Sequence, residues 1–210
     1  MTSLADRRLP AELEEADYEF SGHNIKITMF KGASLGVSCY VWAPGTVLCR
    51  YFEAEKFDFT GKKVIELGSG TGIVGIFVAL LGGDVIMTDR HDVVKQIEYN
   101  IVANVPPSCR HRAQTRALAW GIDQDTFVAD VDVVLGSDIV YNPPQFPGLL
   151  KTLRYFCREK TTIYLCSDVK YREGSAQFHD ELVPELFHSE LIHTSGTNSI
   201  FKVTKKVPGN

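Results

Sequence analysis

The chain has 210 residues, with 22 Lys and Arg against 26 Asp and Glu, and a net charge of −4 at pH 7. This length suits one α/β domain with a sizeable core, which we assign to residues 18–210, after a mobile tail over residues 1–17. The acidic balance argues against direct nucleic-acid binding, because proteins that grip a phosphate backbone are usually basic. The longest apolar run, residues 73–81, is too short to cross a bilayer, so a membrane protein is excluded as well.

The five cysteines are odd in number, form no Cys-x-x-Cys pair and mostly stand in apolar stretches. They therefore indicate reduced core thiols rather than disulfides or zinc ligands, and we expect no bound metal. The polar, acidic residues 1–17 lack the apolar core of a signal peptide. We accordingly expect a cytoplasmic protein, and a monomer.

The first elements are a hairpin and a helix. Residues 18–20 and 24–28 alternate polar and apolar side chains around Ser21-Gly22-His23, a pattern that predicts a small antiparallel hairpin. A helix is expected from about residue 46 to residue 55, where apolar residues recur at helical spacing.

The next stretch is the most informative. Residues 63–67 form a short apolar run typical of a buried parallel strand, Gly68-Ser69-Gly70-Thr71-Gly72 follows, and residues 73–81 predict a buried helix. Strand, glycine turn and buried helix open a nucleotide-binding βαβ unit. A dinucleotide fingerprint would need glycine where Ile73 stands, so that pattern fails. Gly-x-Gly-x-Gly with Glu66 just upstream instead resembles motif I of the Rossmann-like S-adenosylmethionine-dependent methyltransferases. The alternative is a glycine turn that serves only the fold.

A second strand, residues 84–89, ends in Asp89. In a βαβ unit this carboxylate lies at the carboxyl end of the neighbouring strand, where it can accept both hydroxyls of a ribose. The alternative is a cap for the following helix, which carries apolar residues at 93, 97 and 101 and stops before Pro106.

The remaining elements complete an alternating pattern. Strands are expected at residues 114–120, with Trp120 in the loop beyond, at 132–138 and at 161–167. An amphipathic helix follows Pro143-Pro144, and a helix over residues 175–187 should bend near Pro184. Residues 191–194 and 199–203 end the chain as an antiparallel pair. The prediction is an α/β fold, a Rossmann-like doubly wound sheet of about seven strands with an N-terminal hairpin and helix.

Asp138 and Tyr141 stand three residues apart just past the fourth strand, where such sheets bind ligands. Methyl transfer requires an in-line nucleophile, and a lysine amine must also lose its proton. Desolvation beside a sulfonium lowers the pKa of the amine, whereas a carboxylate alone raises it. We therefore expect Asp138 to anchor the remaining hydrogens of the amine, and Tyr141 to form a hydrogen-bonding wall. Asp138 can also contact the methionine amine of the cofactor. The alternative is a helix-capping Asp beside a core Tyr.

Trp42, residues 66–72, Asp89, residues 118–121 and residues 135–141 together resemble the small non-SET protein-lysine methyltransferases of the seven-β-strand class, over residues 18–204. The resemblance implies S-adenosylmethionine as cofactor and Asp138 and Tyr141 as the catalytic Asp-x-x-Tyr motif. The implied substrate is a protein lysine, in translation elongation factor 1-alpha or, as the near alternative, in an Hsp70 chaperone. From the motif and the resemblance together, the cofactor-binding residues are Trp42, Glu66, Gly68, Ser69, Gly70, Gly72, Asp89, Trp120 and Ser137.

Two departures from the family pattern stand out. The family usually has Trp-Asp-Ala-Ala where this chain has Trp42-Ala43-Pro44-Gly45, which leaves open the path of the loop over the cofactor. Ser137 replaces an alanine, a small-for-small exchange. A tryptophan alone more often belongs to a core or an interface, so the roles of Trp42 and Trp120 rest on the resemblance.

Two rival functions are compatible with parts of the sequence. Methyltransferases that act on the amines or amides of bases or glutamine place Asn-Pro-Pro-aromatic at the end of this strand, and this chain has Asn142-Pro143-Pro144-Gln145. The missing aromatic residue and the position of Asn142 past the strand end both count against that rival. A non-catalytic interaction module is the other, and the intact glycines and acids argue against it.

Overall fold

The computed structural model describes residues 12–31 and 35–206. Residues 1–11 of the expected tail lie outside the described residues.

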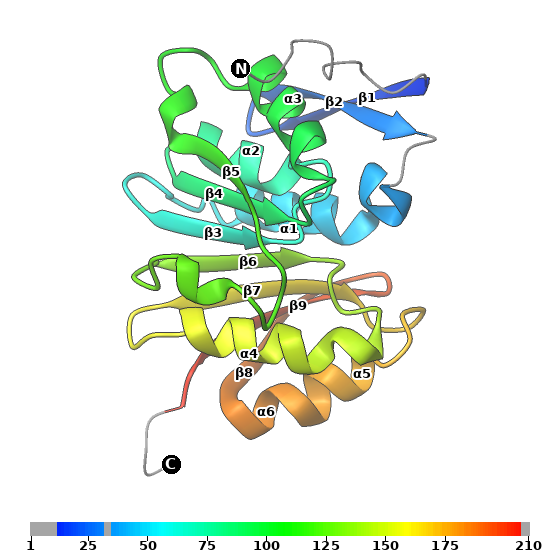
Figure 1. Ribbon diagram of the computed structural model, residues 1–210, viewed down its shortest axis with the longest axis vertical. Coiled ribbons are helices and arrows are strands. Elements are labelled where there is room, and N and C mark those ends of the chain that lie inside the picture. Colours follow the sequence, from blue (N-terminus) through cyan, green and yellow to red (C-terminus); the bar gives the residue numbers. More distant parts are fainter. Residues whose placement is uncertain (1–11, 32–34, 207–210) are drawn as a thin grey trace.

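The centre of the fold is a seven-stranded sheet with the order β5-β4-β3-β6-β7-β9-β8 (Figure 1). The first five of these strands run parallel, and β9 and β8 are antiparallel additions at one edge. From β3 the chain adds β4 and β5 on one side, and it then crosses back to add β6 and β7 on the other side, so the topological switch point lies between β3 and β6. The strands are β3 (Lys63–Leu67), β4 (Asp84–Asp89), β5 (Ala113–Ala117), β6 (Val133–Ser137), β7 (Thr162–Asp168), β8 (Phe187–Ser195) and β9 (Asn198–Lys205). This arrangement confirms the predicted doubly wound sheet.

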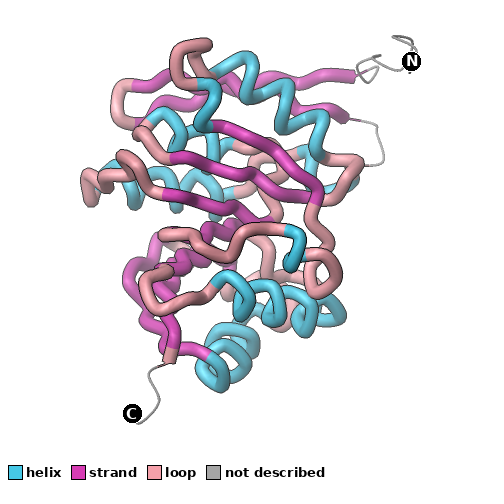
Figure 2. The backbone as a smooth tube through the Cα atoms, turned by 60° about the vertical axis from the view of Figure 1, so that its left-hand side comes forward, coloured by secondary structure: helices cyan, strands magenta, loops and turns pink. Residues whose placement is uncertain are grey.

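Helices cover both faces of the sheet, and a separate core fills each layer (Figures 1 and 2). Successive residues of a strand point to opposite faces, so Val64 joins one core and Ile65 the other. Strands buried on both sides read as continuous apolar runs, which is why the sequence located them. One layer holds α1 (Ala43–Ala54), α2 (Ile73–Leu80) and α3 (Val94–Asn104); the other holds α4 (Phe146–Phe156), α5 (Ser175–Gln177) and α6 (Val183–Leu186).

The N-terminal hairpin is longer than expected. β1 (Glu12–Phe20) pairs antiparallel with β2 (His23–Lys31), so residues 12–17, which the sequence placed in a tail, form most of a strand. β1 is largely exposed over residues 12–15, and only Ala16, Tyr18 and Phe20 alternate with charged residues and turn toward the core. Its partner supplies most of the buried residues of the hairpin, including Ile25 and Ile27.

Three amide side chains of α3, spaced four residues apart, fix the hairpin to the main body. Their carboxamide oxygens accept the backbone N–H groups of alternate residues of β2: Gln96 from Phe30, Asn100 from Thr28 and Asn104 from Lys26. Four helical residues rise about 6 Å and two strand residues about 6.6 Å, so the two repeats match. We call these three residues the amide ladder. It satisfies the open edge of β2 without another strand.

Several boundaries differ from the expectation. α1 begins at Ala43 rather than near residue 46, because Pro44 suits the first helical turn. β5 ends at Ala117, so residues 118–120 belong to the loop. The expected helix over residues 175–187 is interrupted by a π-helical segment, Phe178–Leu182, immediately before Pro184, as the missing proline N–H would predict. Within the described residues, none of the helices has both the length and the apolar character to span a bilayer.

Candidate active site

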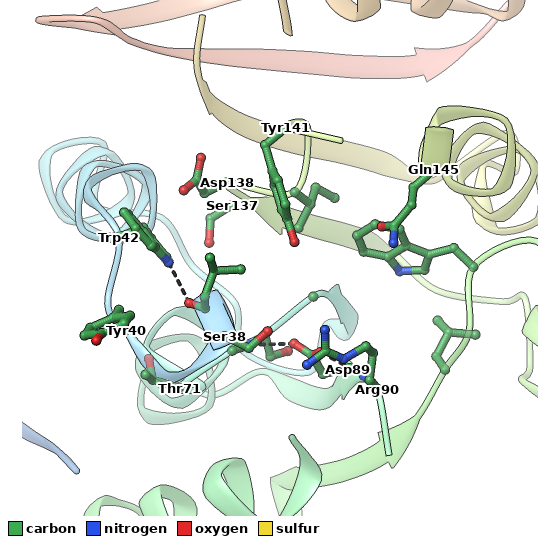
Figure 3. A pocket seen from close by; sticks show the side chains of 18 of the residues that line it. Ser38, Tyr40, Trp42, Thr71, Asp89, Arg90, Ser137, Asp138, Tyr141 and Gln145 are labelled. Atoms are coloured by element: carbon green, nitrogen blue, oxygen red, sulfur yellow. Dashed lines mark hydrogen bonds between the residues drawn. The ribbon is translucent and has the colours of Figure 1, made fainter. Parts of the chain in front are cut away.

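A pocket of about 430 Å³ opens at the carboxyl ends of the parallel strands (Figure 3). Most of the site residues expected from the sequence line it, although they come from distant parts of the chain. They are Trp42, Gly68, Ser69, Gly70, Asp89, Trp120, Ser137, Asp138 and Tyr141. Glu66 and Gly72 do not appear in this lining.

The glycine turn is shaped by what surrounds it. Gly68 has a φ of 65°, and a Cβ added there would lie 2.6 Å from Ile139 Cγ2 and 3.2 Å from Trp120 Cζ2. No other residue adopts this conformation in this space without strain. The Gly70 N–H donates to Asp89 Oδ2 at 2.8 Å, so the turn and the end of β4 are held together.

Glu66 and Gly72 lie behind the turn rather than in the pocket. Glu66 is buried, and its Oε2 accepts the Gly75 N–H of α2 at 3.1 Å. Burial raises the pKa of Glu66 to about 8, against the opposing effect of that hydrogen bond. Gly72 packs closely on α3, since an added Cβ would lie 3.1 Å from Ile97 Cγ2. These two motif residues support the turn from beneath.

Glu66 should make stability depend on pH. A carboxyl group whose pKa rises from 4.5 in the unfolded chain to about 8 in the fold binds its proton more tightly when folded. The free energy of unfolding should therefore fall as pH rises from about 4.5 to 8. Glu66→Gln removes this titration, so the free energy of unfolding of the variant should not show this fall. Relative to the wild type, the variant should therefore be more stable at pH 8.5 than it is at pH 5.5. Urea unfolding at both pH values measures this, and an identical pH dependence in the two proteins would contradict it.

Asp89 is buried at the end of β4, with both oxygens engaged by backbone. Oδ2 accepts the Gly70 N–H and Oδ1 accepts the Arg90 N–H, each at 2.8 Å. A carboxylate offers about four acceptor sites, so two remain for a ligand in the pocket. Burial raises the pKa of Asp89, and the two N–H donors oppose that shift. The capping alternative is wrong, because α3 begins after Val93 and has no side-chain cap.

The segment before α1 covers one side of the pocket. Arg90 Nη2 donates to Leu35 O at 3.2 Å, and Gln96 Nε2 donates to Ser38 O at 2.9 Å. Trp42 Nε1 donates to Val37 O at 2.8 Å, which orients its ring. A Cβ added to Gly45 would lie 3.5 Å from its nearest neighbour, an ordinary contact. An alanine at position 45 would therefore fit the same backbone path.

Trp120 is held by a close contact between its loop and α4. Gly121 and Gly148 touch, with an added Cβ on Gly121 only 2.7 Å from Gly148 Cα. The Gly121 N–H donates to Thr152 Oγ1 at 2.9 Å. Gln145 lies on this side of the pocket, on the side of Tyr141 away from Asp138 (Figure 3). Asn142, the residue that the amide-directed rival requires, is absent from the lining.

Asp138 has a partner that the sequence did not suggest. Arg172, in the loop after β7, donates from Nε to Asp138 Oδ1 at 3.0 Å and from Nη2 to Oδ2. The side chain of Asp138 is 5% exposed and that of Arg172 is 28% exposed. Asp138 has a φ of 54°, a left-handed conformation that Asp tolerates better than most residues. The Arg172 guanidinium also lies 4.6 Å from the centre of the Trp42 ring.

Tyr141 reaches into the pocket from the loop after β6 (Figure 3). Burial, reinforced by the nearby carboxylates of Asp89 and Asp138, raises the pKa of its hydroxyl. The phenol therefore stays protonated at neutral pH and can both donate and accept a hydrogen bond. Among the residues of the described ranges, no group of three His, Cys, Asp or Glu is placed to hold a metal ion.

The sheet order, the glycine turn and the pocket at the switch point define a class I methyltransferase fold. A solved structure of the T. Thermophilus 16S rRNA N2 G1207 methyltransferase superposes with a TM-score of 0.67 at 15% identity, covering 95% of this chain and 52% of that one. The profile of the lysine methyltransferase family matches residues 20–183, and the chain belongs to that family. The predicted fold class, family and methyl-donor cofactor, S-adenosylmethionine, are thereby confirmed.

Three relatives show which named lysine methyltransferases this chain is similar to. It is 46% identical over 194 residues to EEF1A lysine methyltransferase 3 of Xenopus tropicalis, covering 91% of this chain and 86% of that protein. The Mus musculus protein of that name is 51% identical over 178 residues, with coverage of 85% and 76%. Protein N-lysine methyltransferase METTL21A of Xenopus tropicalis is 40% identical over 157 residues, with coverage of 75% and 72%.

Proposed function

We propose that this protein transfers a methyl group from S-adenosylmethionine to a lysine amine of translation elongation factor 1-alpha. The observation that carries the proposal is the convergence of Asp89, Asp138 and Tyr141 on one pocket beside the glycine turn. The names of the relatives with 46% and 51% identity support the choice of substrate. We further propose that it acts in the cytoplasm as a monomer, in keeping with its five free cysteines.

The lining fits the cofactor. The turn at Gly68 lets backbone approach a ligand closely, Asp89 keeps two acceptor sites for ribose hydroxyls, and Trp42 and Trp120 provide aromatic faces. When bound, S-adenosylmethionine supplies a methyl group on a positively charged sulfur. Ser137, Asp138 and Tyr141 line the part of the pocket beyond β6.

The role of these residues is to place a neutral amine in line with the methyl. The protonated Tyr141 hydroxyl can accept a hydrogen bond from one N–H of the amine, which leaves the lone pair of the amine nitrogen directed at the methyl. Arg172 neutralises the charge of Asp138. A carboxylate whose charge is balanced by a neighbouring cation raises the pKa of an incoming amine less than a lone carboxylate would, which favours the reactive form.

Asp89→Asn tests the ribose contact. Because the amide keeps the shape but loses the charge and one acceptor, cofactor affinity should fall roughly 10- to 100-fold, the equivalent of a charge-assisted hydrogen bond. The melting temperature without cofactor should also fall, because the single amide oxygen can accept only one of the two backbone N–H groups, of Gly70 and Arg90, that the carboxylate holds. Calorimetric titration with S-adenosylhomocysteine measures the affinity. Unchanged affinity would show that Asp89 only ties the glycine turn to β4.

The proposed function is tested by incubating the purified protein with labelled S-adenosylmethionine and, separately, elongation factor 1-alpha, an Hsp70 chaperone and total RNA. Label should appear on a lysine of the elongation factor, located by mass spectrometry of its peptides. Label on Hsp70 alone would keep the reaction and replace the substrate. Label on RNA or on glutamine would favour the amide-directed rival, and cofactor binding without any transfer would favour a non-catalytic module.

A further inference from the structure

The pocket has two chemically different ends, and the strand order separates them. Beyond β5 the lining is apolar and aromatic, with Leu118, Trp120 and Ile122. Beyond β6 and β7 it carries the paired charges of Asp138 and Arg172. Asp89, at the end of β4, falls between these ends in the order β5-β4-β3-β6-β7. A ligand with its ribose at Asp89 therefore has an apolar neighbourhood on one side and a charged one on the other.

The charged end is more than a structural ion pair. A partly buried pair stabilises a fold little compared with apolar residues of the same volume, because both ions lose their hydration. Asp138 uses two of the five N–H groups of the Arg172 guanidinium. Within residues 12–31 and 35–206, no other acceptor takes a hydrogen bond from the Arg172 guanidinium. The pair lines the pocket, so its remaining donors and acceptors are available to a ligand.

S-adenosylmethionine has the same two-ended character. Its adenine is flat and largely apolar, and its methionine end carries an α-ammonium and an α-carboxylate. With the ribose at Asp89, the adenine suits the side of Trp120, and the methionine end suits the side of Asp138. The zwitterion brings one positive and one negative charge to a pair that already holds one of each. At the amino-acid end of the cofactor, binding exchanges one ion pair for two, and the zwitterion adds no net charge there.

We propose that Arg172 binds the α-carboxylate of S-adenosylmethionine, while Asp138 takes the α-ammonium. The pair seen in the structure opens to receive this zwitterion, and the guanidinium presents the fork geometry that suits a carboxylate. The contact of Arg172 with the Trp42 ring keeps the cation at this end of the pocket. The inference rests on the proposed function, from which it takes the cofactor.

The experiment is a calorimetric comparison of three ligands without any protein substrate: S-adenosylmethionine, its decarboxylated form, and 5′-methylthioadenosine, which lacks the whole amino-acid end. The variants are Arg172→Gln, Arg172→Lys and, as matched control, Lys170→Gln in the same loop. The wild type should prefer S-adenosylmethionine over the decarboxylated form by roughly 10- to 100-fold, the value of a charged hydrogen bond. In Arg172→Gln this preference should shrink to less than about threefold, with methylthioadenosine affinity unchanged. Arg172→Lys should keep part of the preference for S-adenosylmethionine over the decarboxylated form, and Lys170→Gln should keep all of that preference.

Several results would overturn the inference. A preference that survives in Arg172→Gln would show that the guanidinium does not meet the carboxylate. An equal loss of affinity for all three ligands would mean that Arg172 has only a structural role. The melting temperature of Arg172→Gln would then fall as well. Retained preference with a pH–turnover profile shifted to higher pH would assign Arg172 to the substrate amine instead. Failure of the wild type to bind any of the three ligands would defeat the proposed function itself, which keeps the two failures distinct.

Discussion

Asp138→Ala is expected to lower turnover on a protein substrate by roughly 100- to 1,000-fold at saturating cofactor, the range typical of misplaced reacting groups and lost preorganised contacts. Asp138 is buried at the end of β6 and paired with Arg172, whose guanidinium lies against the Trp42 ring. Without the carboxylate, both the methionine end of the cofactor and the incoming amine should lose an anchor. Turnover with labelled cofactor, measured beside calorimetric affinity, separates the two effects.

Two companion variants sharpen this prediction. Asp138→Asn keeps the side-chain volume, so it separates the loss of charge from the loss of packing around Arg172. Tyr141→Phe removes only a hydroxyl from a half-buried ring, so its loss of turnover should be smaller, with cofactor affinity changed less than about tenfold. Near-normal turnover in Asp138→Ala and Tyr141→Phe would remove both residues from the mechanism.

Much of this fold could be predicted because its central strands are buried on both faces. β3 and β4 were expected over the residues they occupy, since parallel strands under two helical layers must be continuously apolar. The glycine turn was equally visible, because Gly68 occupies a conformation and a space that exclude any side chain.

What escaped prediction depends on distant partners. Residues 12–17 form a strand because β2 pairs with them, and residues 12–15 are exposed and mostly acidic, so no apolar alternation marks the start of β1. Arg172 stands 34 residues from Asp138, and nothing near it in the sequence marks it as a pocket residue. Glu66 was placed in the pocket because it adjoins the glycines, yet strand alternation turns its side chain under α2.

The amide ladder was missed for a related reason. Apolar spacing identified the core face of α3 through Ile97 and Ile101, but polar residues on a helix usually indicate solvent. Gln96 and Asn100 are instead fully buried, and their amides join the hairpin to the glycine turn: Gln96 Nε2 donates to Gly70 O at 3.1 Å and Asn100 Nδ2 to Thr71 O at 2.9 Å. The ladder thus connects an N-terminal element to the pocket.

Asn100→Leu is therefore expected to be strongly destabilising. Leucine has a similar size but leaves three buried backbone groups without a partner: the Thr28 N–H, the Thr28 carbonyl and the Thr71 carbonyl. At roughly 1–3 kcal/mol for each unsatisfied group, the loss should reach about 4 kcal/mol. Against a total stability of about 5–15 kcal/mol, this lowers the melting temperature by about 10 °C.

Asn104→Leu is the matched control, because Asn104 pairs with Lys26 in the same way at the solvent-exposed end of the ladder. Water can replace its amide there, so the loss should stay below about 1 kcal/mol. Urea unfolding of the two variants gives the difference directly. Calorimetry should find weaker cofactor binding in Asn100→Leu alone, because Asn100 holds Thr71, which is part of the glycine turn. Equal destabilisation by the two substitutions would mean that burial does not set the strength of these contacts, and that the hairpin is held by its apolar side chains instead.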